Sequence, residues 1–149
     1  MSITKLVAFL AGCAALLPLP AFAQSIAQET PVYFGNLVVG GPSSVTMATN
    51  SDSRSSTGQV ILLGQRPVQR GHIDITFTPG AQVLISYPSS IQLSGANAPI
   101  FTPVLDGSNI RTIPPSGVLT VYFGGTLTFS GPCPIGETFA LISISVTPA

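Results

Sequence analysis

The sequence has few of the residues on which metal and catalytic sites depend. It holds one histidine, His72, and two cysteines, Cys13 and Cys133, among 149 residues. The common metal sites need several His, Cys or acidic ligands that fold together. Acidic residues are few and scattered, and no spacing in the chain supplies such a cluster. We therefore predict no metal ion and no cofactor.

Charge is also scarce, at 7% of the chain, and the formal net charge is zero. There is no basic stripe of the kind that binds nucleic acid and no acidic tail, so we predict no nucleic-acid partner. Solubility depends on Ser, Thr, Asn and Gln instead. A surface near zero net charge gives little repulsion between copies, so self-association is not opposed.

A serine-type hydrolase would have to use His72. Asp74 lies two residues further on the same strand face, so the two side chains could come close. That face also carries Arg70, Thr76 and Thr78, which is the composition of an ordinary solvated strand. No serine lies in a Gly-x-Ser-x-Gly motif, and no phosphate-binding or dinucleotide-binding motif occurs. The sequence therefore predicts no catalytic residue and a function that is not enzymatic.

The first 23 residues differ from the rest. A short segment with Lys5 is followed by an apolar run over 6–17 and by Ala21-Phe22-Ala23. This pattern is typical of a secretory signal peptide with an A-x-A cleavage site. The apolar run is shorter than the roughly 20 residues that span a bilayer. We expect cleavage after Ala23, and no transmembrane segment in the mature chain.

A second processing site gives an alternative. Leu10-Ala11-Gly12-Cys13 resembles a lipobox, in which Cys13 would be lipidated and anchor the protein to a membrane. With either site the protein is exported across the inner membrane. The expected location is periplasmic, cell-surface or secreted.

The mature part shows strand periodicity and no helical periodicity. The clearest alternation runs over 71–78, where Ile73, Ile75 and Phe77 point one way and His72, Asp74 and Thr76 the other. Short runs like this one recur between clusters of Gly, Pro, Ser and Asn. We predict an all-β fold, a single immunoglobulin-like or pilin-like β-sandwich. The expected division is a signal peptide at 1–23, a loose arm at 24–30 and the sandwich at 31–149.

Several boundaries are specific expectations. We expect a first strand over 31–39, interrupted at Gly35-Asn36, then a turn at Gly40-Gly41-Pro42 and an exposed loop over 49–56. Pro103 places the run over 100–105 at a sheet edge. Gly124-Gly125 either makes a hairpin turn or lies in one long strand kinked by a bulge. The last run, 140–146, also alternates and carries no charge or internal proline.

A few residues are weak candidates for binding. In Tyr33-Phe34 and Tyr122-Phe123 one ring of each pair is expected inward and the other outward. Asp52 and Asp106 lie in separate loops, where such residues usually serve the turn itself. Cys133 lies in a Gly-Pro-Cys-Pro turn, as either an inert, partly buried thiol or the site of an intermolecular disulfide.

The order of segments resembles the exported bacterial family called domain of unknown function 4402. The resemblance covers most of the mature chain, and its most specific piece is Gly-Gly-Thr-Leu after an alternating run. The matching segments are Tyr33-Phe34-Gly35-Asn36-Leu37, Gly71-His72-Ile73-Asp74-Ile75-Thr76-Phe77, Pro79-Gly80-Ala81 with Val83-Leu84-Ile85, Ser90-Ile91-Gln92-Leu93-Ser94-Gly95 and Leu119-Thr120-Val121-Tyr122-Phe123-Gly124-Gly125-Thr126-Leu127.

The resemblance implies a fold and an exported location, and no activity. Cys133 and the C-terminal residues 146–149, which include no aromatic residue, depart from the family's usual pattern. We expect a structural or adhesin-like protein, such as a subunit of a surface appendage or envelope layer. It would self-associate or pair strands with another envelope protein. The alternative is a monomeric periplasmic or secreted binding module.

Overall fold

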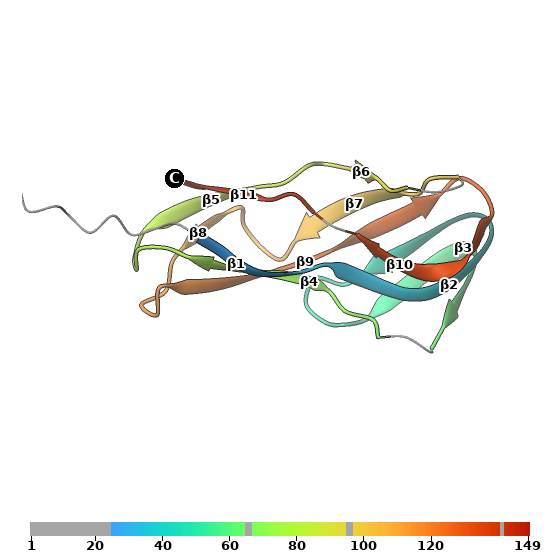
Figure 1. The fold of residues 1–149 in the computed structure, drawn as a ribbon, viewed down its shortest axis with the longest axis horizontal. Coiled ribbons are helices and arrows are strands. Elements are labelled where there is room, and N and C mark those ends of the chain that lie inside the picture. Colours follow the sequence, from blue (N-terminus) through green and yellow to red (C-terminus); the bar gives the residue numbers. More distant parts are fainter. Residues whose placement is uncertain (1–24, 65–66, 95–96, 141) are drawn as a thin grey trace, which may run out of the picture.

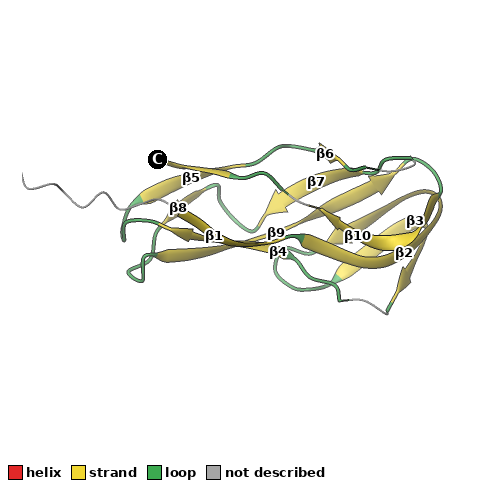
Figure 2. Ribbon diagram, in the orientation of Figure 1, coloured by secondary structure: helices red, strands yellow, loops and turns green. Residues whose placement is uncertain are grey.

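The structure is a computed structural model that describes residues 25–64, 67–94, 97–140 and 142–149. Every regular element in these ranges is a β-strand, and the strands form an elongated sandwich (Figures 1 and 2). The prediction of an all-β sandwich is confirmed. The expected signal peptide and Cys13 lie outside the described residues. The strands are β1 (Ser25–Thr30), β2 (Val32–Met47), β3 (Arg54–Leu63), β4 (Gly71–Thr76), β5 (Gln82–Ser86), β6 (Ile91–Gln92), β7 (Ile100–Leu105), β8 (Ile110–Thr112), β9 (Val118–Phe129), β10 (Cys133–Ala140) and β11 (Ser145–Pro148).

The strands form two antiparallel sheets. The larger follows the order β1-β4-β9-β2-β10, with β3 paired to β2, β7 to β9 and β6 to β7. The smaller has the order β11-β5-β8 and lies at the end of the molecule where β1 begins (Figure 1). In the described ranges no helix is long and apolar enough to cross a lipid bilayer.

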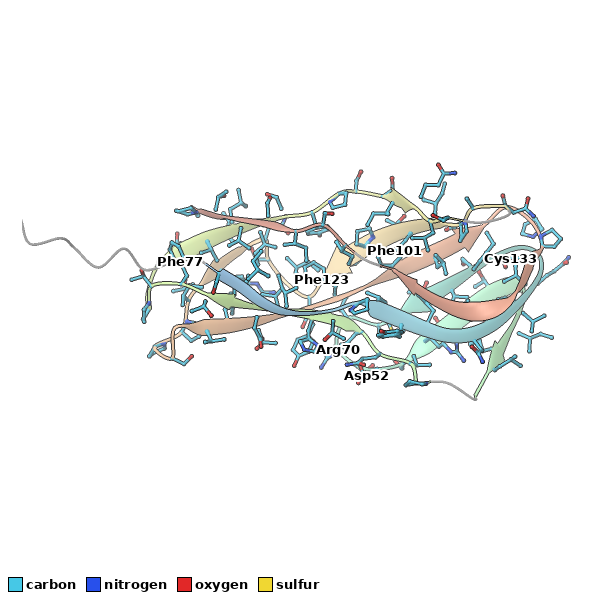
Figure 3. All side chains as sticks on the ribbon, viewed as in Figure 1. Asp52, Arg70, Phe77, Phe101, Phe123 and Cys133 are labelled. Atoms are coloured by element: carbon cyan, nitrogen blue, oxygen red, sulfur yellow. The ribbon has the colours of Figure 1, made fainter. Side chains whose placement is uncertain are left out.

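One hydrophobic core joins the two sheets. Phe34 and Phe101 pack edge to face with their ring centroids 5.7 Å apart, and Tyr87 packs in the same way on Phe123 at 5.7 Å. Figure 3 shows Phe101 and Phe123 pointing into the interior. The buried hydrophobic residues are Val32, Phe34, Leu37, Val39, Val45, Met47, Ile73, Ile75, Val83, Ile85, Phe101, Leu105, Ile113, Val121, Phe123, Leu127, Phe129 and Val146.

The alternation predicted for β4 is confirmed. Ile73 and Ile75 are buried, while the three residues between and beside them are half-buried on the outer face. Phe77 follows the end of the strand and is only partly buried against the core. β4 lies between β1 and β9, so its ladder groups find partners on both sides.

The expected loose arm at 24–30 is wrong. Ser25–Thr30 forms β1 and pairs antiparallel with β4, with Ser25 opposite Thr76 and Thr30 opposite His72. The segment was expected to be loose because it is polar. A polar segment is held nonetheless when a neighbouring strand supplies backbone partners.

The expected turn at Gly40-Gly41-Pro42 is a bend inside a strand. β2 continues from Val32 to Met47, through Gly35-Asn36 as well, and β3 stays paired with it along both halves. The register shifts between Val39 and Ser43, so three residues of β2 bulge at the bend. Figure 1 shows β2 and β3 curling together at the end of the molecule far from β5.

The bend also changes the partner of β2 on its other side. Before it β2 pairs with β10, and after it β2 pairs with β9. The loop expected over 49–56 is shorter than predicted, because β3 begins at Arg54.

Gly124-Gly125 lies inside the single long strand β9, so the hairpin alternative is wrong. Around these glycines β9 exchanges one neighbour for another, with β4 on Val118–Phe123 and β2 on Gly125–Phe129. β7 pairs along the opposite side of β9. β6 covers only Ile100 and Phe101 of β7, so Pro103 has a strand on one side alone, as its position at an edge requires.

The last run is divided between two strands. Ala140 ends β10, and Ser145–Pro148 forms β11, which pairs with β5 at the edge of the smaller sheet. Val146 is buried between exposed Ser145 and Thr147, in agreement with the predicted alternation. Leu141 lies outside the described residues.

Candidate functional site

The two candidate catalytic residues have separate partners. His72 stands opposite Tyr122 in the ladder and Asp74 opposite Thr120. Nε2 of His72 lies 3.4 Å from Oγ1 of Thr30 on β1. Thr120 donates a 2.6 Å hydrogen bond from Oγ1 to Oδ1 of Asp74. Each side chain therefore ties β4 to a neighbouring strand, and no hydrogen bond between His72 and Asp74 is found in the described part of the chain.

Arg70 makes several contacts on this outer face, although the sequence predicted only a solvated side chain there. Its guanidinium carbon lies 3.7 Å from the centroid of the Tyr122 ring, a cation–π contact. Nη1 donates to the carbonyl of Thr49 at 2.8 Å, and Nε lies 3.7 Å from Oδ1 of Asp52. Figure 3 shows Arg70 and Asp52 together on this face. The arginine thus holds the 49–53 loop against the sheet.

Arg54 plays a similar part at the ends of the β2–β3 ribbon, away from its bend. Its guanidinium donates to the carbonyl oxygens of Phe34, of Asn36 at 3.4 Å and of Leu63 at 2.6 Å. Burial of the charged guanidinium lowers the pKa of Arg54 from its ordinary value. The contact with Leu63 joins the two ends of β3, which would lie about 30 Å apart in a straight strand. Arg54 is therefore a clamp that holds the β2–β3 ribbon in its curled form.

The loops that carry Asp52 and Asp106 form no metal centre among the described residues. Oδ1 of Asp52 accepts the backbone N–H of Arg70 at 3.1 Å, besides its ion pair with the same residue. The backbone N–H of Asp106 donates to the carbonyl of Tyr122 at 3.0 Å. Within the described ranges, no group of three or more His, Cys, Asp or Glu residues is placed to hold a metal ion.

The aromatic pairs divide between inside and outside as predicted. Phe34 and Phe123 are buried, while Tyr33 and Tyr122 are half-buried on the outer side. Arg70 covers one face of Tyr122, so that ring is used inside the protein. Tyr122 is therefore not a free aromatic surface for a ligand.

Cys133 is the first residue of β10 and pairs with Val39 of β2. It is a free, half-buried cysteine that packs against the core. The predicted turn is therefore shorter than expected and ends before the cysteine (Figure 3).

The described surface has shallow depressions away from His72 and Asp74. One, of about 320 Å³, lies between the end of β5 and the start of β11 and is lined by Ser86, Tyr87, Pro88, Ser143, Ile144 and Ser145. Another, of about 330 Å³, lies at the bend of the ribbon and is lined by Val38, Gly40, Gly58, Gln59, Val60 and Ile61.

A family described as Domain of unknown function (DUF4402) matches residues 25–147. The match runs from the first residue of β1 into β11 and so includes every strand of the sandwich at least in part. The chain belongs to this family. The family resemblance drawn from the sequence is therefore confirmed. No curated protein and no solved structure matches the chain.

Proposed function

We propose that the protein is an exported, non-enzymatic structural component of the cell envelope or of a surface appendage, and that it acts through its surface and strand edges. One observation carries the proposal. The polar side chains that a catalytic site would use instead hold strands and loops of the fold together, whereas strand β3 presents an open edge. His72, Asp74 and Arg70 contact neighbouring strands or loops, and β3 has a strand on one side only.

Open edges favour a role in assembly. A strand at a sheet edge presents unpaired N–H and C=O groups to which another strand can add. The near-zero net charge adds little repulsion between neighbouring copies. A protein of this kind has no need of a cofactor or a cleft.

Export is the part of the proposal that residues 1–23 support. A charged start, an apolar run and Ala21-Phe22-Ala23 are the parts of a cleavable signal peptide. Mass spectrometry of the protein from its native cells should find an N-terminus at Gln24. A diacylglyceryl group on Cys13 would replace this with the lipoprotein alternative.

A monomeric periplasmic or secreted binding module is the second candidate. The depression that includes Tyr87, Ser86 and Ser143 favours it, because a ring and hydroxyl groups around a hollow suit a small polar ligand.

Fractionation of native cells separates the two functions. For a structural component we expect the protein in large, envelope-bound or extracellular assemblies that externally added protease reaches on intact cells. Recovery as a soluble monomer that retains a small ligand through purification would favour the binding module and contradict the structural role. A cytoplasmic protein would contradict both.

A further inference from the structure

The edge strands of this sandwich differ in how they are protected. Charged residues and prolines on an edge discourage another strand from adding to it. By sequence, most edge strands here contain one or are very short: Glu29 in β1, Pro103 in β7, Pro134 and Glu137 in β10, Pro148 in β11, only three residues in β8 and only two in β6.

β3 is the longest strand in the described ranges that pairs with a single other strand. It has ten residues and pairs with β2 alone. Its one charged residue is Arg54, whose guanidinium turns back onto the carbonyls of Phe34 and Leu63 and so does not guard the edge. From Ser55 to Leu63 the strand contains no charge and no proline.

The bend divides β3 into two arms of different chemistry. The first is rich in Ser and Thr, whereas the second, Gln59–Leu63, is Gln-Val-Ile-Leu-Leu, with the β-branched and apolar composition that suits strand pairing. Ile61, at its centre, is 62% exposed, the highest value among the exposed large hydrophobic residues. The depression at the bend adjoins it. An unguarded edge and an exposed apolar side chain therefore occur in the same five residues.

We propose that the Gln59–Leu63 arm pairs antiparallel with the same arm of a second copy of the chain, about a twofold axis at Ile61. An antiparallel strand pair is self-complementary, since each strand presents the same groups to the other. In this register Gln59 faces Leu63 of the second copy and the two Ile61 side chains cover each other. The arm is neutral, so pairing places no like charges opposite one another.

The inference rests on the proposed function for its cellular setting. It assigns β3 as the edge that takes part in assembly and a second copy of the chain as the partner. β3 lies at the curled end of the molecule, away from the smaller sheet (Figure 1). Pairing there leaves the far end of each copy free for other contacts.

The test uses the purified chain from Gln24 onward and two matched variants. Ile61→Lys and Ile110→Lys each replace an exposed isoleucine on an edge strand, at 62% and 51% exposure, and only the first lies on β3. Sedimentation over a wide range of concentrations should show a monomer–dimer equilibrium for the unaltered chain. Ile61→Lys should weaken it at least about tenfold, and Ile110→Lys should leave it unchanged.

A crosslinking experiment locates the axis. In a Cys133→Ser background, Ile61→Cys should form a disulfide-linked dimer on mild oxidation, because directly opposed residues of paired strands have Cβ atoms about 4.5–5.5 Å apart. Ile110→Cys should remain monomeric under the same conditions. Far-ultraviolet circular dichroism checks that each variant keeps its strands.

The inference is overturned by a strict monomer at every concentration, or by equal effects of the two lysine variants. It is also overturned by equal crosslinking of the two cysteine variants. Those results leave the proposed function standing if fractionation still finds large surface assemblies, since another edge would then be responsible. A dimer through Ile61 in a protein that fractionates as a soluble periplasmic species would support the pairing and contradict the surface role.

Discussion

Gly124 lies where two backbones of the larger sheet come into close approach. A Cβ atom there would lie 2.4 Å from the carbonyl oxygen of Met47, and one on Gly125 would lie 2.4 Å from that of Thr102. Gly125 also has a φ of 142°, a region that side chains disfavour. The pair is therefore required by the packing of β9 between β2 and β7.

Replacing Gly124 with alanine should destabilise the fold by at least about 2 kcal/mol, because a backbone atom must move to make room. Gly64→Ala is the matched control, since a Cβ at Gly64 meets nothing within 4 Å. Its effect should stay within about 0.5 kcal/mol. Chemical unfolding in urea measures both, and a similar cost at the two positions would contradict the close approach.

Arg54 should be the arginine on which stability depends most. Arg54→Ala removes a charged donor from the carbonyls of Phe34, Asn36 and Leu63, and we expect a loss of about 1.5–3 kcal/mol. Arg54→Lys should recover only part of it, because an ammonium group lacks the planar fork of donors.

Arg111→Ala is the control for Arg54, since the hydrogen bond of Arg111 to the carbonyl of Ser108, at 2.7 Å, stays within its own turn. Its loss should stay below about 1 kcal/mol. Full stability in Arg54→Lys would show that charge alone, and not geometry, holds the ribbon.

Substitutions on the two faces of strand β4 test the alternation that the sequence predicted. Ile75 is fully buried, so Ile75→Ala should cost about 2–5 kcal/mol. Thr76→Ala, on the outer face, should change stability by less than about 0.5 kcal/mol. Phe77→Ala should cost less than a fully buried phenylalanine, because Phe77 is only partly buried. Denaturant unfolding of the three variants gives the order, and equal losses at Ile75 and Thr76 would contradict it.

The sequence predicts a strand such as β4 well, because one buried face and one outer face give an alternation that is visible in the strand itself. It could not assign β1, because the pairing with β4 that orders this strand does not show in the strand's own sequence. It also took Gly40-Gly41-Pro42 for a turn, because local chemistry does not show that β3 follows β2 around the bend. Gly124-Gly125 stayed ambiguous for the same reason, since the backbones that need those glycines belong to distant strands.

In the candidate site, too, features that show in the local alternation were predicted and features that depend on distant residues were missed. The inward and outward aromatic rings were predicted from alternation, and so was the solvated face of His72 and Asp74. Arg54 and Arg70 were missed as structural clamps because their partners Phe34, Thr49 and Asp52 are 18 to 21 residues away in the chain. No local spacing signals such a contact.

For the whole molecule, the scarcity of charge predicts that stability depends little on salt. The Arg70–Asp52 pair is long at 3.7 Å, and the Asp52 side chain is 56% exposed. Such a pair contributes little to stability, so salt has little stabilisation to remove by screening. We expect Asp52→Asn to cost less than about 1 kcal/mol. The difference from the unaltered chain should shrink further at high sodium chloride in urea unfolding, and a growing difference would contradict this account.

The position of β2 has a consequence for the order in which the chain can fold. On the side away from β3, this early strand pairs with β9 and β10, which come late in the sequence. Ser43 pairs with Phe129, and Leu37 pairs with Gly136. During synthesis from the N-terminus, one side of β2 stays unpaired until the last quarter of the chain has been made. Pairing between such distant segments is slow, in the millisecond to second range. The interval between emergence and closure is thus when this protein is most exposed to aggregation and to capture by a chaperone.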